Sequence, residues 1–183
     1  IYCECGYNED HKTKAKLPTF ETTIQALKEK LAKMKEADEK LDVITFAGNG
    51  EPTLHPNFSE IIDQTIRLRN LYYPNVKISV LTNAMHLDKT KVFEALKKVD
   101  NNILKLDSAF IDTVKLIDRP NSNLYNIDKQ IKLFKMFEGN FILQTMFIRG
   151  EHEGVKVDNT TEEEIRAWLE IVKEIKPREV MIY

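Results

Sequence analysis

The fold of this chain is decided at the stretch Thr45-Phe46-Ala47-Gly48-Asn49-Gly50-Glu51-Pro52-Thr53-Leu54, where an apolar run passes into a glycine-rich turn. Gly48 and Gly50 allow the backbone to take φ > 0 and leave room for a ligand, and Glu51 adds one carboxylate. Pro52 has no N–H group, so the strand cannot continue its hydrogen bonding there. These residues alone are as consistent with an ordinary strand-to-helix loop as with a site that holds a small molecule.

Strand-like and helix-like segments alternate along the rest of the chain. Short apolar, β-branched runs predict strands over residues 41–47, 76–81, 103–106, 141–148 and 179–183. Apolar residues at helical spacing predict helices over residues 20–38, 56–72, 89–99, 127–137 and 160–175. This alternation is typical of parallel strands joined by right-handed crossovers. The predicted fold class is therefore α/β, as either a partial (βα) barrel or a doubly wound sheet, and both bind ligands at the carboxyl ends of their strands.

Composition limits the class of protein. A chain of 183 residues with 42% hydrophobic and 31% charged residues can bury one core, which predicts a single domain over residues 1–183. The formal net charge of -2 gives no overall attraction to nucleic acid but leaves RNA open as a substrate. No apolar run approaches the ~20 residues of a membrane span and no segment resembles a signal peptide, so we expect a cytoplasmic protein without a membrane partner. Cys3 and Cys5 are too close in sequence for an unstrained disulfide, which favours reactive or metal-binding thiols.

Polar residues follow four of the predicted strands. They are Gly48 to Glu51, Thr82-Asn83, Asp107-Ser108 and Arg149-Gly150. Because the carboxyl ends of parallel strands share one rim, we expect these groups to converge there. Thr82 and Ser108 are as consistent with capping a helix after a strand as with binding, whereas Glu51 and Arg149 favour binding.

Other conspicuous side chains are interpreted structurally. Trp168, Phe134 and Phe137 lie at helical spacing with apolar neighbours, which predicts core positions. The four histidines fall in predicted loops, where a histidine is usually solvated. His55 is the exception to note, because it lies beside the glycine turn.

Taken together, these features resemble the radical S-adenosylmethionine (SAM) superfamily over nearly the whole chain. The features are a thiol loop before a helix, a strand that ends in Gly-Asn-Gly-Glu-Pro, strands that end in Thr-Asn and Asp-Ser, and a strand that ends in Arg. In that family three cysteines spaced CxxxCxxC bind a [4Fe-4S] cluster, and an aromatic residue commonly precedes the third. Tyr2-Cys3 is similar to this ending, so the resemblance implies Cys3 as a cluster ligand. The other two cysteines are then expected before Ile1, and Cys5 has no family role.

The resemblance also implies an architecture and a chemistry. The architecture is a partial (βα)6 TIM-like barrel of parallel strands with outer helices, in which the first strand and part of the cluster loop are expected to be missing. The cluster would bind SAM at its open iron and give it one electron, so that a 5′-deoxyadenosyl radical abstracts hydrogen from a substrate. The protein would bind, orient and exclude water, and no catalytic acid or base of its own is expected.

Cofactor contacts follow from the same resemblance. The segment Gly48, Asn49, Gly50, Glu51 is similar to the family's Gly-Gly-Glu motif, with Asn49 inserted or substituted, and would hold the amino group of SAM. Ser108 would approach the SAM carboxylate or ribose, and Arg149 the carboxylate. The weaker candidates are Thr82, Asn83, Asp107 and Gln144.

Partners follow in the same way. An electron donor such as flavodoxin or ferredoxin is expected. The motif with its trailing Glu-Pro-Thr-Leu-His-Pro is similar to that of members that modify tRNA and of members that activate other enzymes by making a glycyl radical. The substrate therefore stays open among a small molecule, tRNA and protein.

Two other functions remain open at this point. Cys3, Cys5 and His11 could form part of a zinc site in a non-catalytic α/β module, because thiolates and imidazole suit tetrahedral zinc. The glycine turn could instead be the anion site of a barrel enzyme that acts on a phosphorylated metabolite. Glu51 argues against the phosphate, since a carboxylate repels it.

Overall fold

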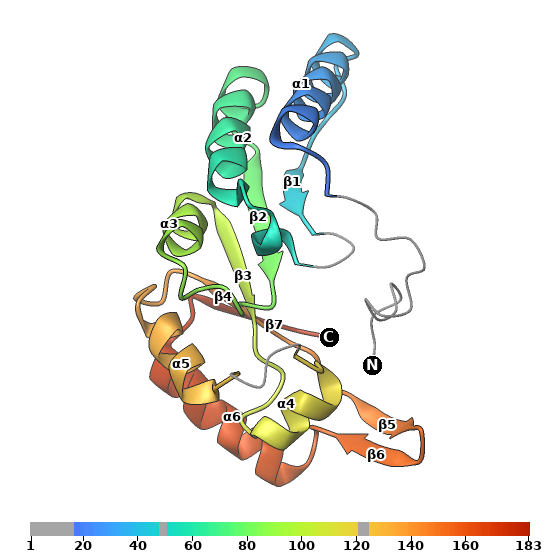
Figure 1. The fold of residues 1–183 in the computed structure, drawn as a ribbon, viewed down its shortest axis with the longest axis vertical. Coiled ribbons are helices and arrows are strands. Elements are labelled where there is room, and N and C mark those ends of the chain that lie inside the picture. Colours follow the sequence, from blue (N-terminus) through green and yellow to red (C-terminus); the bar gives the residue numbers. More distant parts are fainter. Residues whose placement is uncertain (1–16, 48–50, 121–124) are drawn as a thin grey trace. The chain divides into compact units, whose positions relative to one another are not determined.

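A computed structural model describes residues 17–47, 51–120 and 125–183 of the chain (Figure 1). The elements in chain order are α1 (Phe20–Glu36), β1 (Val43–Phe46), the 3₁₀ turn η1 (Pro52–Leu54), α2 (Phe58–Tyr72), β2 (Lys77–Thr82), α3 (Thr90–Lys98), β3 (Asn101–Lys105), α4 (Ile111–Ile117), α5 (Ile127–Lys135), β4 (Ile142–Thr145), β5 (Arg149–His152), β6 (Val155–Asp158), α6 (Glu162–Ile175) and β7 (Glu179–Ile182). Within the described part of the chain, no helix is both long and apolar enough to cross a membrane.

The strands form a five-stranded parallel sheet in the order β1-β2-β3-β4-β7, and β5 and β6 form a two-stranded antiparallel ribbon. The α/β class and the parallel arrangement predicted from the alternation are therefore confirmed. The chain divides into two compact units, which are described separately below. The N-terminal unit holds the described residues up to Thr82 together with Asp88–Asn102, and the C-terminal unit holds Asn83–Leu87 and Ile103–Tyr183.

The N-terminal unit is built on the β1–β2 pair, which runs in register from Val43↔Lys77 to Phe46↔Val80. Helix α1 packs against α2, and α2 packs against α3; Figure 1 shows α1 and α2 side by side. Ile61 and Ile62 of α2 are buried, as their spacing predicts. In α1 the only buried side chain is Leu31.

The C-terminal unit is built on the β3–β4 and β4–β7 pairs, with α5 packed against α6. Trp168 is buried, and its Nε1 donates a hydrogen bond of 3.1 Å to Thr145 Oγ1. Phe134 and Phe137 are buried as well, and both lie against Phe141. The core roles predicted for these three side chains are confirmed.

The predicted strand over residues 141–148 is too long. Strand β4 ends at Thr145, because the next N–H group on the β3 side, that of Met146, donates to the Asp107 side chain at 3.0 Å. The N–H of Ile148 likewise donates to the Asn159 side chain at 2.7 Å. Side-chain acceptors thus replace the sheet ladder on the β3 side, whereas on the β7 side the Phe147 N–H still donates to the Tyr183 carbonyl at 3.0 Å.

The ribbon β5–β6 and the short helix α4 are absent from the sequence prediction. The ribbon turns at Glu153 and Gly154, which have φ of 52° and 77°. Two consecutive residues with positive φ are typical of a two-residue β-hairpin turn. The polar residue followed by Gly at this position is the sequence pattern that could have predicted the hairpin. Helix α4 has seven residues, too few for its helical spacing to stand out.

Candidate functional site

Glu51 is the predicted site residue with the best-defined surroundings, and its contacts with Thr53 and Thr82 lie within the N-terminal unit. Its Oε1 accepts hydrogen bonds from the Thr53 N–H at 3.1 Å, from Thr53 Oγ1 at 2.7 Å and from Thr82 Oγ1 at 2.6 Å. Thr53 is 3% exposed and Thr82 is 5% exposed. The structure therefore brings Glu51 and Thr82 together at the carboxyl end of β2, and it adds Thr53, which the sequence analysis missed.

Local sequence explains this arrangement. Pro52 begins the 3₁₀ turn, where its fixed φ suits the first helical position and its missing N–H group is not needed. Glu51 is extended, with φ of -113° and ψ of 115°, and caps the turn with its own side chain. A carboxylate two residues before Thr53 in a cap position is the signal that could have identified the Glu51–Thr53 contact.

Several predicted contacts lie outside the described residues. They are the contacts of Gly48, Asn49 and Gly50 with SAM, and of Cys3 with the cluster. The zinc alternative, with Cys3, Cys5 and His11, lies outside them too. Within the described ranges, no group of three or more His, Cys, Asp or Glu side chains could hold a metal ion.

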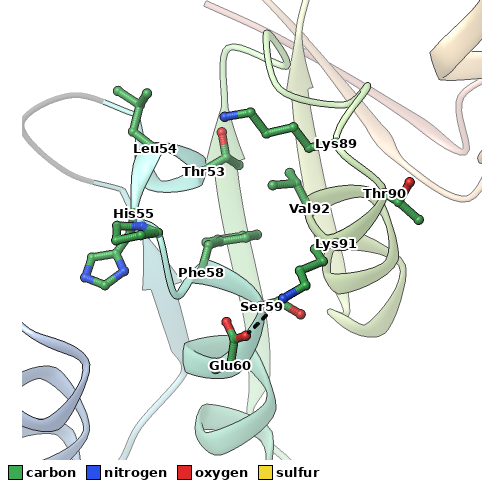
Figure 2. A pocket seen from close by; sticks show the side chains of 11 residues that line it. Thr53, Leu54, His55, Phe58, Ser59, Glu60, Lys89, Thr90, Lys91 and Val92 are labelled. Atoms are coloured by element: carbon green, nitrogen blue, oxygen red, sulfur yellow. Dashed lines mark ion pairs between the residues drawn. The ribbon is translucent and has the colours of Figure 1, made fainter.

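A cavity of about 310 Å³ lies beside the Glu51 turn and is lined by residues of the segments 53–60 and 89–92. Thr53 is part of its wall, so the residue that holds Glu51 also borders the cavity. Figure 2 shows Lys89 and Lys91 on the α3 side of the cavity, with Lys91 paired to Glu60 at 3.7 Å. The lining is mixed, with apolar, hydroxyl and charged groups.

His55 has a structural role in its loop. Its Nδ1 accepts the Asn57 N–H at 3.1 Å, so Nε2 carries the proton and donates to the Pro18 carbonyl at 2.9 Å. Both ring nitrogens therefore contact backbone groups. His55 thus differs from a solvated loop histidine, because backbone groups of its own loop and of Pro18 hold its ring.

Asn83 follows β2 and belongs to the C-terminal unit. Its side chain is exposed, and its Oδ1 accepts the Met85 N–H at 3.0 Å. Ala84 between them has φ of 60°, and its carbonyl accepts a hydrogen bond of 2.8 Å from Gln130 Nε2. Asn83 thus shapes a strained turn, and its contact with SAM stays a prediction.

Ser108 is fully buried in the C-terminal unit. Its Oγ donates to Glu164 Oε2 at 2.7 Å and accepts the Phe110 N–H at 2.8 Å. Thr113 Oγ1 donates to the other oxygen of Glu164 at 2.5 Å. Ser108 thus holds the turn before α4, whose N-cap is Phe110 without a side-chain cap, and its contact with SAM stays a prediction.

Arg149 begins strand β5 rather than following a strand of the parallel sheet. Its side chain is 80% exposed, and its Nε lies 3.1 Å from Asp158 Oδ2. Hydrogen bonds from the side chain and backbone of Thr160 lower the pKa of Asp158, and the charge of Arg149 lowers it further. The contact of Arg149 with the SAM carboxylate stays a prediction.

The sequence analysis missed a charged cluster at the end of β3, formed by Lys105, Asp107 and Asp118. Lys105 Nζ lies 2.6 Å from Asp107 Oδ2 and also contacts Asp118 Oδ1. Burial raises the pKa of Asp107 to about 7, and the charge of Asp118 adds to the increase. Burial lowers the pKa of Lys105, but the two carboxylates raise it by more. The sequence pattern that could have predicted this cluster is a lysine two residues before an aspartate at the end of an apolar strand. Side chains at positions i and i+2 of a strand lie on the same face of the sheet.

Comparison with known families gives one match over most of the chain. The sequence model of the Radical SAM superfamily matches residues 1–154. A UPF0026 protein of Synechocystis is 34% identical over 186 residues, which cover all of this chain and 63% of that protein. A Brachyspira hyodysenteriae protein named GTPase Obg is 32% identical over 187 residues, covering all of this chain and 25% of that protein. The UPF0026 protein MJ1312 of Methanocaldococcus jannaschii is 28% identical, covering 97% of this chain and 52% of that protein.

The chain thus spans between 25% and 63% of the length of these relatives. This chain contains no G-x-x-x-x-G-K-[ST] phosphate loop.

Solved structures show the same fold. TYW1 with a lysine-pyruvate adduct bound aligns with a TM-score of 0.61 at 14% identity, covering 98% of this chain and 59% of that one. SuiB of Streptococcus suis bound to S-adenosylmethionine gives a TM-score of 0.59 at 20% identity, covering 94% and 35%. A domain of pyruvate-formate lyase-activating enzyme from Bacteroides vulgatus gives 0.55 at 21% identity, covering 76% and 78%. These likenesses decide the architecture in favour of the barrel-like fold over the doubly wound sheet.

Proposed function

Because the chain belongs to the radical SAM superfamily, we propose that residues 1–183 form the SAM-binding core domain of a cytoplasmic enzyme that abstracts hydrogen from its substrate. When bound, a [4Fe-4S] cluster supplies the electron that cleaves SAM to a 5′-deoxyadenosyl radical. The chain's own residues bind SAM, orient it and keep water away. Cys3 is the proposed cluster ligand of this chain.

The observation that carries this proposal is the fixed carboxylate of Glu51. Three donors hold its Oε1 at the carboxyl end of β2, within 2.6 to 3.1 Å. A carboxylate held in this way suits an ammonium group, because charge-assisted hydrogen bonds are among the strongest in proteins. The residues described here therefore fit the amino group of SAM. They suit a phosphate poorly, since the nearest charge to it would have the same sign.

The remaining parts of the proposal rest on the family. We propose Gly48, Asn49 and Gly50 as further SAM contacts, together with Ser108 and Arg149 for its carboxylate or ribose. The electron donor is a small redox protein such as flavodoxin or ferredoxin. The substrate is a small molecule, a tRNA or a protein, and mass spectrometry of deuterium transferred into 5′-deoxyadenosine from labelled candidates would identify the class.

The proposed cluster is tested on protein that is expressed from the whole coding sequence and purified without oxygen. We expect a brown protein with about four irons, which loses its colour in Cys3→Ala and produces 5′-deoxyadenosine from SAM when reduced. A colourless protein that carries zinc would contradict the proposal and favour the structural metal site.

The carboxylate is tested with Glu51→Gln. Loss of one charge-assisted hydrogen bond, worth about 1.5–3 kcal/mol, predicts a SAM affinity lower by about 10- to 100-fold. The matched control is Glu94→Gln in the same unit, whose carboxylate is 54% exposed and forms an ion pair of 3.7 Å with Lys97. Equal affinities in the two variants would contradict the assignment of Glu51.

A further inference from the structure

We propose that Thr53 and Thr82 are positioning residues, which act on SAM binding through the Glu51 carboxylate rather than by touching the cofactor. The inference rests on the proposed function. It changes the role expected for Thr82, which the family resemblance suggested as a direct contact, and it gives Thr53 the same positioning role.

The geometry of the two hydroxyl groups supports this role. Thr53 Oγ1 and Thr82 Oγ1 lie 2.7 Å and 2.6 Å from the same carboxylate oxygen. Both distances are typical of hydroxyl groups that donate to a charged acceptor. Both threonines are nearly fully buried, so each hydroxyl is directed to Glu51 inside the protein instead of to bulk water.

The two threonines hold different parts of the structure. Thr53 lies in the same turn as Glu51, and its backbone N–H and hydroxyl fix the carboxylate relative to that turn. Thr82 is the last residue of β2, so its hydroxyl fixes the carboxylate relative to the sheet. The turn η1 packs directly against β2, so the Thr53 and Thr82 contacts meet at the end of this strand.

Such anchoring affects affinity in a definite way. A free glutamate side chain loses rotamer freedom when it binds a ligand, and this loss weakens binding. A carboxylate already held by three donors has lost that freedom in the folded protein. Removing the Thr82 hydroxyl returns part of the freedom and breaks the tie to the sheet, so Thr82→Val should weaken SAM binding more than Thr53→Val, which leaves the Thr53 N–H contact in place.

The experiment measures SAM affinity by calorimetry on the anaerobically reconstituted protein from the whole coding sequence. The variants are Thr82→Val, Thr82→Ser, Thr53→Val and the double variant Thr82→Val with Glu51→Gln. We expect about a tenfold loss in Thr82→Val, recovery to within about twofold in Thr82→Ser, and less than a twofold further loss when Thr82→Val is added to Glu51→Gln. Thr65→Val is the control, because Thr65 is a buried threonine of the same unit outside this cluster.

The outcomes separate the two proposals. Full SAM affinity in both Thr82→Val and Thr53→Val would overturn this inference and leave the proposed function standing. The same holds if Thr82→Val lowers SAM affinity by the same factor in the wild-type protein and in the Glu51→Gln variant. Thermal unfolding of each variant shows whether a loss follows a general weakening of the fold. A loss of SAM affinity in Thr82→Val that follows its loss of thermal stability, and that Thr65→Val shows to the same extent, would also overturn the inference. A wild-type protein that does not bind SAM would overturn the proposed function, and the inference with it.

Discussion

Lys105 and Asp107 form a buried ion pair of 2.6 Å at the end of β3, and the same ammonium group contacts Asp118 at the end of α4. The backbone N–H of Met146 donates to the other oxygen of Asp107. The pair therefore joins three segments of the C-terminal unit. It also places the carboxyl groups of Asp107 and Asp118 beside the single ammonium group of Lys105 at largely buried positions. The stability of the fold should therefore depend on the protonation of this cluster.

The Asp107 carboxyl should make stability depend on pH. Its pKa is raised from 3.8 to about 7, mainly by burial and then by Asp118. Between these values the folded protein binds more protons than the unfolded chain, so the contribution of Asp107 to the free energy of unfolding falls as pH rises from about 4 to about 7. The slope is at most about 1.4 kcal/mol per pH unit for one whole proton. Lys105 does not change this window, because its pKa lies above 10.5.

Urea unfolding of wild type and Asp107→Asn at pH 5, 6, 7 and 8 checks this prediction. The wild type should lose stability relative to the variant as pH rises. Asp112→Asn, at an exposed position of α4, should keep the wild-type slope. Parallel curves for wild type and Asp107→Asn would contradict the raised pKa.

Asn159 should be one of the most sensitive polar residues of the C-terminal unit. Its Nδ2 donates to the Asp107 carbonyl at 2.8 Å and to the Met146 carbonyl at 2.7 Å, while its Oδ1 accepts the Ile148 N–H. Asn159→Ala leaves these backbone groups without their partner at a buried position, which predicts a loss of about 2–4 kcal/mol. Asn70→Ala at an exposed position should change stability by less than about 0.5 kcal/mol. Similar unfolding midpoints for the two variants would show that Asn159 does not join these segments.

Two glycines with positive φ provide a matched test of backbone strain. A Cβ at Gly139, with φ of 82°, would lie 2.7 Å from the Lys176 carbonyl oxygen, whereas a Cβ at Gly154, with φ of 77°, meets nothing within 4 Å. Gly154→Ala should cost about 1 kcal/mol from conformation alone. Gly139→Ala adds the steric clash and should cost about 2–4 kcal/mol in chemical unfolding. If both variants lose the same stability, the contact at Lys176 is relaxed without cost.

Arg149 can be tested as a cofactor contact independently of Glu51. If its guanidinium binds the SAM carboxylate, Arg149→Ala should lower SAM affinity about tenfold, the effect of losing one charge-assisted hydrogen bond. Arg166→Ala is the control, because Arg166 is also exposed and paired with a carboxylate, that of Glu162. Unchanged affinity in Arg149→Ala would assign this residue to the hairpin, where it pairs with Asp158.

The fold could be predicted from local patterns to a large extent. The strands at β1, β2, β3 and β7 and the helices at α1, α2, α3, α5 and α6 were each expected within a few residues of their bounds. These elements have enough length for a period of 3.6 or a run of β-branched residues to be visible. The ends of β4 and the elements α4, β5 and β6 could not be placed, because they depend on side-chain acceptors such as Asp107 and Asn159 that come from other parts of the chain.

By itself, the sequence determined the α/β class, the parallel strands and the position of Glu51 in a turn at the end of a strand, because periodicity and turn chemistry are local properties. The tertiary structure alone decided which groups surround each charge. Thr82 reaches Glu51 across 31 residues of sequence, and Glu164 reaches Ser108 across 56. Such contacts depend on how helices and strands pack in three dimensions, and no local pattern of residues specifies which distant hydroxyl or carboxylate will be the partner.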